Sequence, residues 1–517
     1  MIITLGGIAK RLLIVVLFIA LTAVSLIFSV YLIISADGIY MNFLAFSFTA
    51  LSLFSGIFNI LSSYSYYRSY FYAEYLEKLN KTLKPLTRYP TVAVMIPTYN
   101  ESPEMVARCV ESVKGLEYAK DRIKFYLIDD SSDPAIKYAN QKMCKKNGLT
   151  CINRELRSNF KAGAFNNALK HSKEEFVAIF DADEHLTNKR FLLDLLPYFQ
   201  DKNVSFVQTE KRARKGTLFS ESVDVFDGIF FRFIQPARAL NGTAIFAGSC
   251  GVIRRSALDA VGGFPEFITE DTFFSFESDM HNFKSIFVPK IYALGKPILS
   301  FSKLMSQQWR YNYGDTQFLL YFLRQRKLDK NRVQATRSAL SKIDYMAHGF
   351  GLNYISSILI LFTLVSMLIV LSVAPFAYLS IKQAFTPPYT ALNLELLGIS
   401  AFLLTVLVPV ALSKAYFNSA RKGLMIFILN FALAFARLKG AAAALLSKKP
   451  VWITGNVGKE KRLFAAARNS GIELTFSIVL FSTSFVAALV YNISGALWLL
   501  WYGILYCSAF VFYYKYG

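Results

Sequence analysis

Residues 177–183 read Val-Ala-Ile-Phe-Asp-Ala-Asp, an apolar run followed at once by two aspartates that one alanine separates. A run of this kind is typical of a buried strand, so Asp181 and Asp183 are expected where that strand ends. Carboxylates gathered at one place repel each other unless a cation is bound. The sequence therefore predicts a Mg²⁺ or Mn²⁺ site, with Asp183 as the direct ligand and Asp181 beside it.

Three further runs of the same character lie at residues 92–96, 125–128 and 204–207, and a helical pattern follows each. This βα alternation predicts a mostly parallel sheet, whose ligands lie outside the carboxyl ends of its strands. The polar residues that follow the strands are therefore assigned to the substrate. They are Thr98, Tyr99, Glu101, Asp129, Asp130 and Asp181.

The tripeptide Thr269-Glu270-Asp271 follows a Gly/Pro turn cluster at 262–265 and opens a helical pattern over 272–280. Acidic residues stabilise a helix N-terminus, which would explain one of the two acids without any function. The functional interpretation makes Asp271 the general base that takes a proton from an attacking hydroxyl, with Glu270 at the substrate.

Lys161, in a glycine-containing segment, and the Gln307-x-x-Arg310 pair are suited to hold a departing diphosphate. Arginine does so through two parallel hydrogen bonds. Trp309 and Tyr311 accompany the pair, and their rings can stack on a sugar. Aromatic residues also form belts at membrane interfaces, which is the competing interpretation. A belt requires no amide and guanidinium three residues apart on one helical face, which favours a substrate site.

Composition assigns much of the chain to lipid. Hydrophobic residues make up 54% of the 517 residues and aromatic residues 15%, at a mean hydropathy of +0.36, above the usual values for soluble proteins. Charge-free stretches long enough to cross a hydrocarbon core predict six membrane-spanning helices. They cover residues 12–35, 39–63, 350–381, 396–413, 474–491 and 493–514.

Lysines and arginines flank these stretches, which predicts that both termini and the central domain are cytoplasmic. Two stretches near these charges, 318–342 and 424–436, are expected to lie on the cytoplasmic membrane face among lipid headgroups. The net charge of +22 comes largely from such flanking residues, and no basic-aromatic tract indicates nucleic acid. Five scattered cysteines indicate neither a disulfide framework nor a zinc site.

Together these motifs resemble those of the membrane-embedded family-two glycosyltransferases, the group that contains the cellulose, chitin and hyaluronan synthases. That family carries an early Asp pair, a D-x-D, a T-E-D and a Q-x-x-R-W motif. The counterparts in this chain are Asp129-Asp130, Asp181/Asp183, Thr269-Glu270-Asp271 and Gln307-x-x-Arg310. The likeness covers about four fifths of the chain.

The resemblance implies a multi-pass α-helical protein of the cell membrane with a cytoplasmic α/β glycosyltransferase domain of the Rossmann-like GT-A type. The expected division is a transmembrane hairpin at 1–87, the catalytic domain at 88–302, interface helices at 303–348 and a C-terminal membrane region at 349–517.

The resemblance also implies inverting, processive transfer from a UDP-sugar, with the growing polysaccharide extruded through a channel between the spans. The segment Lys161-Ala162-Gly163 and the T-E-D motif look most like those of the β-glucan synthases, which favours UDP-glucose and a cellulose-like product. A single-sugar transferase with a membrane-lipid acceptor is the first alternative. A transporter with a regulatory central domain is the second, and the lack of charged residues within the spans argues against it.

The chain departs from the family pattern in two motifs. Tyr311 stands where the family has the Trp of Q-x-x-R-W, and Glu210 replaces the Pro of a Q-T-P segment. Trp452 and Thr454, assigned to the substrate, lie where the cellulose synthases carry a gating loop, expected here within 450–459. Such a loop can close over a bound donor; an ordinary juxtamembrane turn is the alternative.

Overall fold

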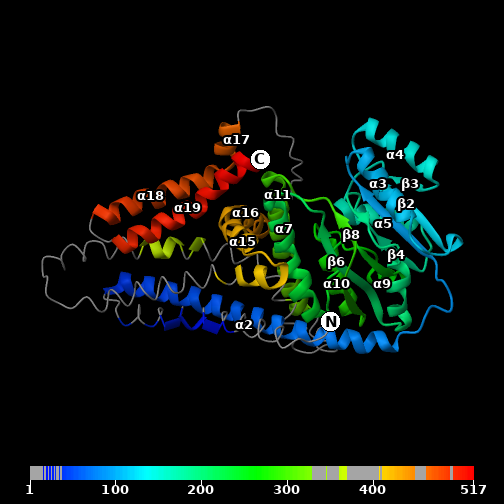
Figure 1. The fold of residues 1–517 in the computed structure, drawn as a ribbon, viewed down its shortest axis with the longest axis horizontal. Helices are drawn as coiled ribbons and strands as arrows, with labels where there is room; N and C mark the ends of the chain where they lie inside the picture. Colours follow the sequence, from blue (N-terminus) through cyan, green and yellow to red (C-terminus); the bar gives the residue numbers. More distant parts are fainter. Residues whose placement is uncertain are drawn as a thin grey trace.

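The computed structural model describes residues 38–328, 410–448, 462–489 and 493–517, with isolated positions between 16 and 34 and between 345 and 407. An α/β domain forms one end of the elongated molecule, and long helices extend from it towards the other end (Figure 1). The strands of this domain run from Val92 to Gly295. The predicted α/β fold of the central region is therefore confirmed.

Eight strands form one sheet in the order β3-β2-β1-β4-β7-β6-β8-β5. The four strands that the apolar runs predict are present as β1 (Val92–Thr98), β2 (Ile123–Asp129), β4 (Phe176–Ile179) and β6 (Val204–Ala213). The four strands that those runs did not reveal are β3 (Thr150–Asn153), β5 (His185–Leu186), β7 (Gly251–Arg254) and β8 (Lys284–Gly295).

The first half of the sheet is parallel, as predicted, because β1 pairs in parallel with both β2 and β4. The second half is mixed, since β7 runs antiparallel to β4 and to β6. Strands β1, β2 and β4 consequently end at one edge of the sheet. This edge receives the residues at or just after the strand ends, Thr98, Asp129 and Asp181.

Helices cover both faces of the sheet, and alternate residues of β1 enter the two cores. Val94 and Ile96 are fully buried in the core that α3 (Pro103–Lys114) covers, whereas Ala93 and Met95 are buried on the opposite face with Phe165 of α5 (Phe160–Lys170). Full burial stabilises a side chain of the size of Val, Ile or Phe by about 1.5–3 kcal/mol. The strand that delivers Thr98 is thus fixed from both sides.

Helices α3 and α4 (Pro134–Asn147) begin where the sequence supplies a cap. Ser102 accepts from the N–H of Met105, and Asp133 accepts from the N–H of Ala135 at 2.8 Å; each cap is followed by a proline, which suits the first helical position. Helix α4 ends at Gly148, whose φ of +70° favours glycine. Both helices lead the chain back to the start of the next strand.

The remaining helices of the domain connect these layers. They are η1 (Lys120–Arg122), α6 (Phe191–Leu195), η2 (Leu196–Gln200), α7 (Leu218–Ile229), the π-helical turn η3 (Phe230–Ile234), α8 (Gln235–Ala239), α9 (Arg255–Val261) and α10 (Glu270–Met280).

Helix α2 (Gly38–Thr82) carries the predicted span at 39–63 and continues onto the sheet domain. Tyr72, which is 1% exposed, donates its hydroxyl proton to the carbonyl of Phe287 at 2.5 Å and accepts from the N–H of Phe287 at 3.0 Å. A buried tyrosine hydroxyl needs such partners. The end of α2 is therefore anchored to β8.

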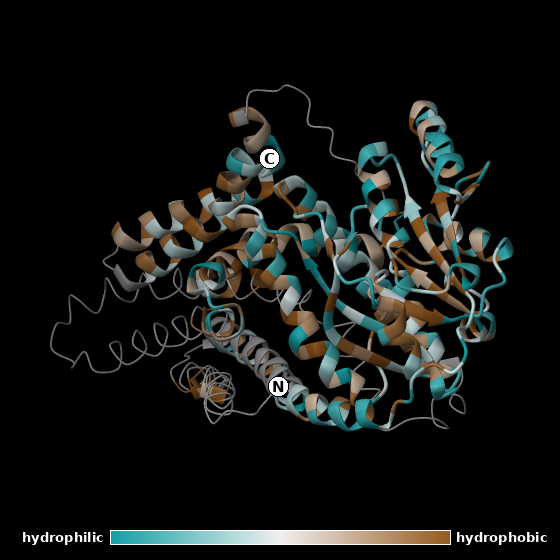
Figure 2. Ribbon diagram, turned by 45° about the vertical axis from the view of Figure 1, so that its right-hand side comes forward, coloured by the Kyte–Doolittle hydropathy of each residue, from teal (hydrophilic) through white to brown (hydrophobic). Residues whose placement is uncertain are grey.

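Two helices in the described part of the chain are long and apolar enough to cross a membrane, α18 (Gly471–Leu489) and the Gly495–Tyr516 part of α19 (Ile493–Tyr516). They coincide with the last two predicted spans. Hydrophobic residues, brown on the ribbon of Figure 2, recur along both helices. The C-terminal end of α19 returns to the sheet domain, where Tyr516 stacks on Phe219 of α7 at 4.6 Å between ring centres.

The stretch 424–436, expected as one surface helix, is divided between α15 (Ala420–Ala432) and α16 (Ala434–Leu445), which meet at an angle of 47°. The two together are long and apolar enough for one broken span or a re-entrant loop. Arg437, 1% exposed, joins α16 to α11 (Phe301–Leu328) by donating to Oε1 of Gln308 at 2.8 Å.

The predicted spans at 12–35, 350–381 and most of 396–413 lie largely outside the described residues, as does the interface stretch beyond Leu328. Helix α17 (Arg462–Asn469) precedes the last two spans.

Candidate active site

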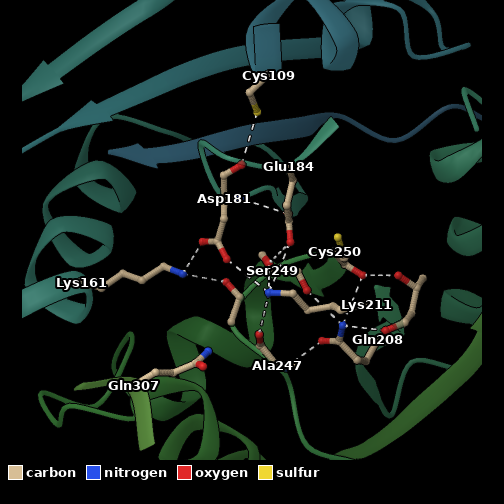
Figure 3. Close-up of polar contacts among 12 residues, drawn as sticks. Cys109, Lys161, Asp181, Glu184, Gln208, Lys211, Ala247, Ser249, Cys250 and Gln307 are labelled. Carbon is tan, nitrogen blue, oxygen red and sulfur yellow. Dashed lines mark hydrogen bonds and ion pairs between the residues drawn. The ribbon is translucent and has the colours of Figure 1, made fainter. Parts of the chain in front are cut away.

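The turn after β4 carries Asp181 and Asp183 beyond the carboxyl end of the strand. Glu184 closes this turn: its N–H donates to the carbonyl of Asp181 at 2.9 Å, and its carboxylate accepts from the N–H of Asp181 at 2.9 Å. The thiol of Cys109, on α3, donates to the same carbonyl at 3.4 Å (Figure 3). The backbone of the D-x-D turn is thus fixed by its own residues and by α3.

Two lysine ammonium groups hold the Asp181 carboxylate (Figure 3). Nζ of Lys161, on α5, lies 2.7 Å from Oδ1, and Nζ of Lys211, on β6, lies 3.2 Å from Oδ2. Burial acts to raise the pKa of Asp181, but the charges of Lys161 and Lys211 outweigh it and hold the pKa below its usual value. Asp181 is therefore ionised, and the protein itself supplies its counter-charge.

Lys211 is a site residue that the motifs did not predict. Its ammonium lies 3.3 Å from Oε1 of Glu184 and also donates to the hydroxyl of Ser249. That hydroxyl donates in turn to Oε1 of Glu184 at 2.7 Å. Burial acts to lower the pKa of Lys211, but the charges of Glu184 and Asp181 outweigh it and hold the pKa well above its usual value. The only signal in the sequence was the basic run at 211–215.

Asp183 is the D-x-D carboxylate that lacks a direct counter-ion. Within the described residues, its side chain makes no hydrogen bond or ion pair. Burial, followed by the charges of Asp181 and Glu184, raises the pKa of Asp183 to about 7. No set of three or more His, Cys, Asp or Glu side chains in the described ranges is arranged to hold a metal by itself. Since Mg²⁺ commonly uses one or two carboxylates together with substrate phosphates and water, Asp183 fits a metal that arrives with a diphosphate.

The T-E-D residues begin α10, and Asp271 faces the same space as the D-x-D turn. Its Oδ1 accepts from the N–H of Thr272 at 2.8 Å. A β-carbon at Gly248, where φ is +77°, would lie 3.1 Å from Oδ2 of Asp271 and 3.6 Å from Nζ of Lys161. The carbonyl of Gly248 accepts from Lys161 at 3.0 Å. One glycine loop, which a side chain would strain and crowd, therefore brings the base candidate beside the lysine that binds Asp181.

Glu270 and Asp271 form a pair of neighbouring carboxyl groups with raised pKa values. Burial, followed by the charge of Asp271, raises the pKa of Glu270 to about 7, against the opposing charges of Lys161 and Arg310. Burial also raises the pKa of Asp271. A carboxylate that accepts a proton more readily than usual is a better general base near neutral pH.

Helix α11 brings the Q-x-x-R residues to the carboxyl pair. Nε2 of Gln307 donates to the hydroxyl of Tyr311 at 2.9 Å, and the guanidinium of Arg310 lies 5.7 Å from the centre of the Tyr311 ring. The charge of Arg310 acts to lower the pKa of both Glu270 and Asp271, so Arg310 lies within electrostatic reach of them. The T-E-D and Q-x-x-R motifs, which are separate in the sequence, therefore lie close together in the structure.

Trp309 makes its ring contact along the helix. It stacks on Tyr313 at 5.3 Å, and the hydroxyl of Tyr313 donates to the carbonyl of Lys448, just beyond α16. The Trp309–Tyr313 contact therefore links α11 to the C-terminal helices, whereas Tyr311 accompanies Arg310 and Gln307.

The ends of β1 and β2 form a second polar region at the same sheet edge. Oδ1 of Asp129 accepts from the N–H of Ser131 at 2.9 Å. Oδ2 of Asp129 and the hydroxyl of Thr98 are buried without a hydrogen-bond partner in the described part of the chain. The ring of Tyr99 lies 3.6 Å from the guanidinium of Arg157. Unpaired buried polar atoms at a strand end indicate a site that a polar ligand completes.

Asp130 occupies a different environment from Asp129. Its Oδ1 accepts from Nε of Arg154 at 2.9 Å, and both side chains are 8% exposed. Arg154 also donates to the carbonyls of Ser158 and Phe160. Asp130 therefore fixes the loop that leads into Lys161.

Of the three remaining residues predicted to bind substrate, the structure describes one, Glu101. Glu101 lies near the D-x-D turn, and its side chain remains accessible to water. Partial burial of its carboxyl group and the charge of Asp181 raise its pKa, whereas the charges of Lys303 and Lys296 oppose the shift. Trp452 and Thr454 lie outside the described residues.

Glu210, which replaces the family proline, belongs to a contact between the sheet and the C-terminal helices. Its Oε1 lies 3.5 Å from Arg212 and 3.3 Å from Arg232. The two guanidinium groups lie 5.0 Å and 4.7 Å from the ring centre of Phe417, and Arg232 donates to the carbonyl of Tyr416 at 3.1 Å. The glutamate in place of the Q-T-P proline therefore takes part in a joint, formed with Arg212, Arg232 and Phe417, that connects the sheet to the C-terminal helices.

The gathered groups suit the displacement of a phosphate-linked leaving group. Asp271 can accept a proton, Lys161 and Arg310 can bind negative charge that develops on a diphosphate, and Asp183 can bind a divalent cation.

Comparison with known proteins indicates the same family as the sequence motifs. Residues 93–262 match the model of glycosyl transferase family 2, which confirms the resemblance inferred from the motifs. A cellulose synthase catalytic subunit (UDP-forming) of Pseudomonas fluorescens is 30% identical over 237 residues, which cover 44% of this chain and 31% of that protein. A probable glucomannan 4-beta-mannosyltransferase of Oryza sativa is 29% identical over 281 residues, or 51% of this chain and 46% of that protein.

The chain spans about a third of the length of the cellulose synthase subunits that it matches. Among solved structures, the mannosyltransferase PcManGT from Pyrobaculum calidifontis, in complex with GDP-Man and Mn²⁺, has a TM-score of 0.49 and 18% identity, covering 76% of this chain and 99% of that chain.

Proposed function

Because the chain carries a family-two glycosyltransferase domain at residues 93–262, we propose that it transfers a sugar from a UDP-sugar to a hydroxyl acceptor with inversion at the anomeric carbon. The observation that carries the proposal is the position of Asp271: one glycine, Gly248, separates its carboxylate from the Lys161 ammonium that binds Asp181. A base and a leaving-group site are thereby adjacent.

The donor would lie along the sheet edge. Thr98 and Asp129 offer the nucleoside a buried hydroxyl and a carboxylate oxygen without partners in the described residues. Lys161 and Arg310 would bind the diphosphate. A bound Mg²⁺ or Mn²⁺, held by Asp183 with Asp181 beside it, would neutralise diphosphate charge.

The transfer would be a single displacement. The acceptor hydroxyl oxygen attacks the anomeric carbon from the side opposite UDP, a new carbon–oxygen bond forms, and the bond to the diphosphate oxygen breaks. Asp271 takes the hydroxyl proton, and the electron pair of the broken bond leaves with UDP. Attack from the opposite side inverts the configuration.

The product would be a β-linked polysaccharide, with glucose the favoured sugar, extruded through a channel between membrane spans. Three observations support this finer proposal: the similarity to UDP-forming cellulose synthase subunits, the apolar helices α18 and α19, and the contact of α11 with α16 through Arg437. In this proposal the protein is a multi-pass protein of the cell membrane, with both termini and the catalytic domain cytoplasmic.

The test uses the full chain in lipid bilayers with a panel of UDP-sugars and Mg²⁺ or Mn²⁺, following UDP release and product size. We expect one donor to give UDP and a product of high molecular mass. A product with the mobility of a glycolipid would replace the polymer with a single-sugar transfer to lipid. No UDP release with any donor and either metal would overturn the enzyme proposal.

The carboxyl pair predicts a pH dependence of the transfer rate. Burial raises the pKa of the proposed base, Asp271, and the base must be ionised to act. The rate at saturating donor is therefore expected to fall as the pH is lowered, and to begin falling at a higher pH than an ordinary aspartate would give. Glu270→Gln removes a like charge and should move that fall to lower pH. An unchanged midpoint in this variant would contradict the coupling of the two groups.

A further inference from the structure

Lys211 occupies a place in the site that the proposed chemistry leaves unassigned. We infer that Lys211 is a built-in counter-ion for the turn at 181–184, which prevents that turn from holding a divalent metal until the nucleotide donor brings one. The inference rests on the proposed function, because it concerns the metal that would accompany a UDP-sugar.

The position of the ammonium carries the inference. Nζ of Lys211 lies 3.2 Å from Oδ2 of Asp181 and 3.3 Å from Oε1 of Glu184, between carboxylates that would otherwise attract a cation. It also donates to the hydroxyl of Ser249 and lies 3.4 Å from the carbonyl of Ala247 (Figure 3). An ammonium has three protons to donate, so these acceptors satisfy it fully.

Alternation along β6 directs Lys211 to this place. Its two neighbours in the sequence, Glu210 and Arg212, point to the joint around Phe417 on the other side of the strand. The pairing of β6 with β8 shifts register on both sides of Glu210, and the extra residues lie on β8. Lys211 is thus the member of the basic run at 211–215 that reaches the D-x-D turn.

The balance of charges around the turn at 181–184 explains why Lys211 would weaken metal binding there. The turn carries three carboxylates, Asp181, Asp183 and Glu184, against the ammonium groups of Lys161 and Lys211. With Lys211 present, only Asp183 remains for a metal, and one carboxylate binds Mg²⁺ or Mn²⁺ weakly without phosphate oxygens. Without Lys211 the excess of carboxylates over ammonium groups rises from one to two, and the place between Asp181 and Glu184 becomes open to a cation.

The test measures Mn²⁺ binding to the full chain without nucleotide, by the electron paramagnetic resonance signal of free Mn²⁺. We expect Lys211→Met to bind Mn²⁺ about tenfold more tightly than the parent, or better. The double variant Lys211→Met/Glu184→Gln removes both charges of the pair and should return to the parental affinity. Lys211→Arg should also remain close to the parent.

Lys215→Met is the matched control, because it removes one exposed positive charge from the same run. It should leave Mn²⁺ binding unchanged. A folded Lys211→Met protein that still binds UDP with Mn²⁺ but gains no binding of Mn²⁺ alone would overturn the inference. An equal gain in Lys215→Met would also overturn it, since the effect would then be one of overall charge.

The same experiment separates the inference from the function on which it rests. If the parent binds UDP in the presence of Mn²⁺ and Lys211→Met gains no Mn²⁺ binding, only the role of Lys211 fails. If the parent binds no UDP with or without metal, the proposed glycosyltransferase function fails.

Discussion

Asp271→Asn is expected to lower the rate of sugar transfer by about 10²–10⁴-fold, the range that a general base contributes. Asparagine preserves the shape of the side chain and can still accept from the N–H of Thr272, which Oδ1 of Asp271 does at 2.8 Å. The fold of the α10 N-terminus should therefore survive. What disappears is the group that takes the acceptor proton, so kcat falls while the affinity for UDP remains within about twofold of the parent.

The measurement is UDP release at saturating donor, together with the dissociation constant of UDP by calorimetry. Glu266→Gln, an exposed acid shortly before α10, serves as control and should keep parental activity. If Asp271→Asn transferred sugar at the parental rate, Asp271 would not be the general base. A parallel loss of UDP affinity would instead assign Asp271 to donor binding.

The strand ends that position the site were predictable because their residues are strongly patterned. Strand β1 alternates between two apolar cores, and β4 is buried along all four of its residues. A chain with such patterns has little choice of strand position, and the residues that follow each strand are delivered to one edge. Asp129, Asp181 and the start of α10 at Glu270 therefore follow from local sequence.

The missed residues depend on tertiary geometry. Lys211 reaches the D-x-D turn because β6 continues beyond its apolar run and presents Lys211 on the side of that turn, and alternation along a strand does not show which polar groups a side chain will face. Glu184 has its role because the Asp181 N–H needs an acceptor within the turn. Neither Lys211 nor Glu184 could be recognised from its residue type and its place in the sequence.

The Asp pair illustrates the same limit. Asp129 and Asp130 are adjacent in the sequence and chemically alike, yet Oδ2 of Asp129 has no partner in the described residues whereas Asp130 is paired with Arg154. The difference is set by β3, whose register with β2 places Asn153 opposite Asp129 and so brings Arg154 alongside Asp130. That four-residue strand carried no apolar run strong enough to be predicted.

Arg310→Met is expected to lower kcat by about 10²–10³-fold, the loss typical when one donor to a developing negative charge is removed. The residue lies on α11 with its guanidinium 5.7 Å from the centre of the Tyr311 ring and within reach of the charges of Glu270 and Asp271. As the bond to the diphosphate breaks, charge moves onto the leaving oxygen. Arg310 can stabilise that charge through two parallel hydrogen bonds, which methionine cannot form.

Arg310→Lys sharpens the test, because lysine restores the charge without the planar pair of donors. It should recover part of the lost rate, and the remaining deficit measures the contribution of the paired geometry. Arg324→Met, at an exposed position later on the same helix, controls for loss of positive charge on α11 and should retain parental kcat. Equal rates for Arg310→Met and the parent would mean that Lys161 alone binds the leaving diphosphate. Because Lys161 also binds Asp181 at 2.7 Å, its ammonium is shared with the D-x-D turn, and this sharing is the physical reason to expect that a second cation from α11 is required.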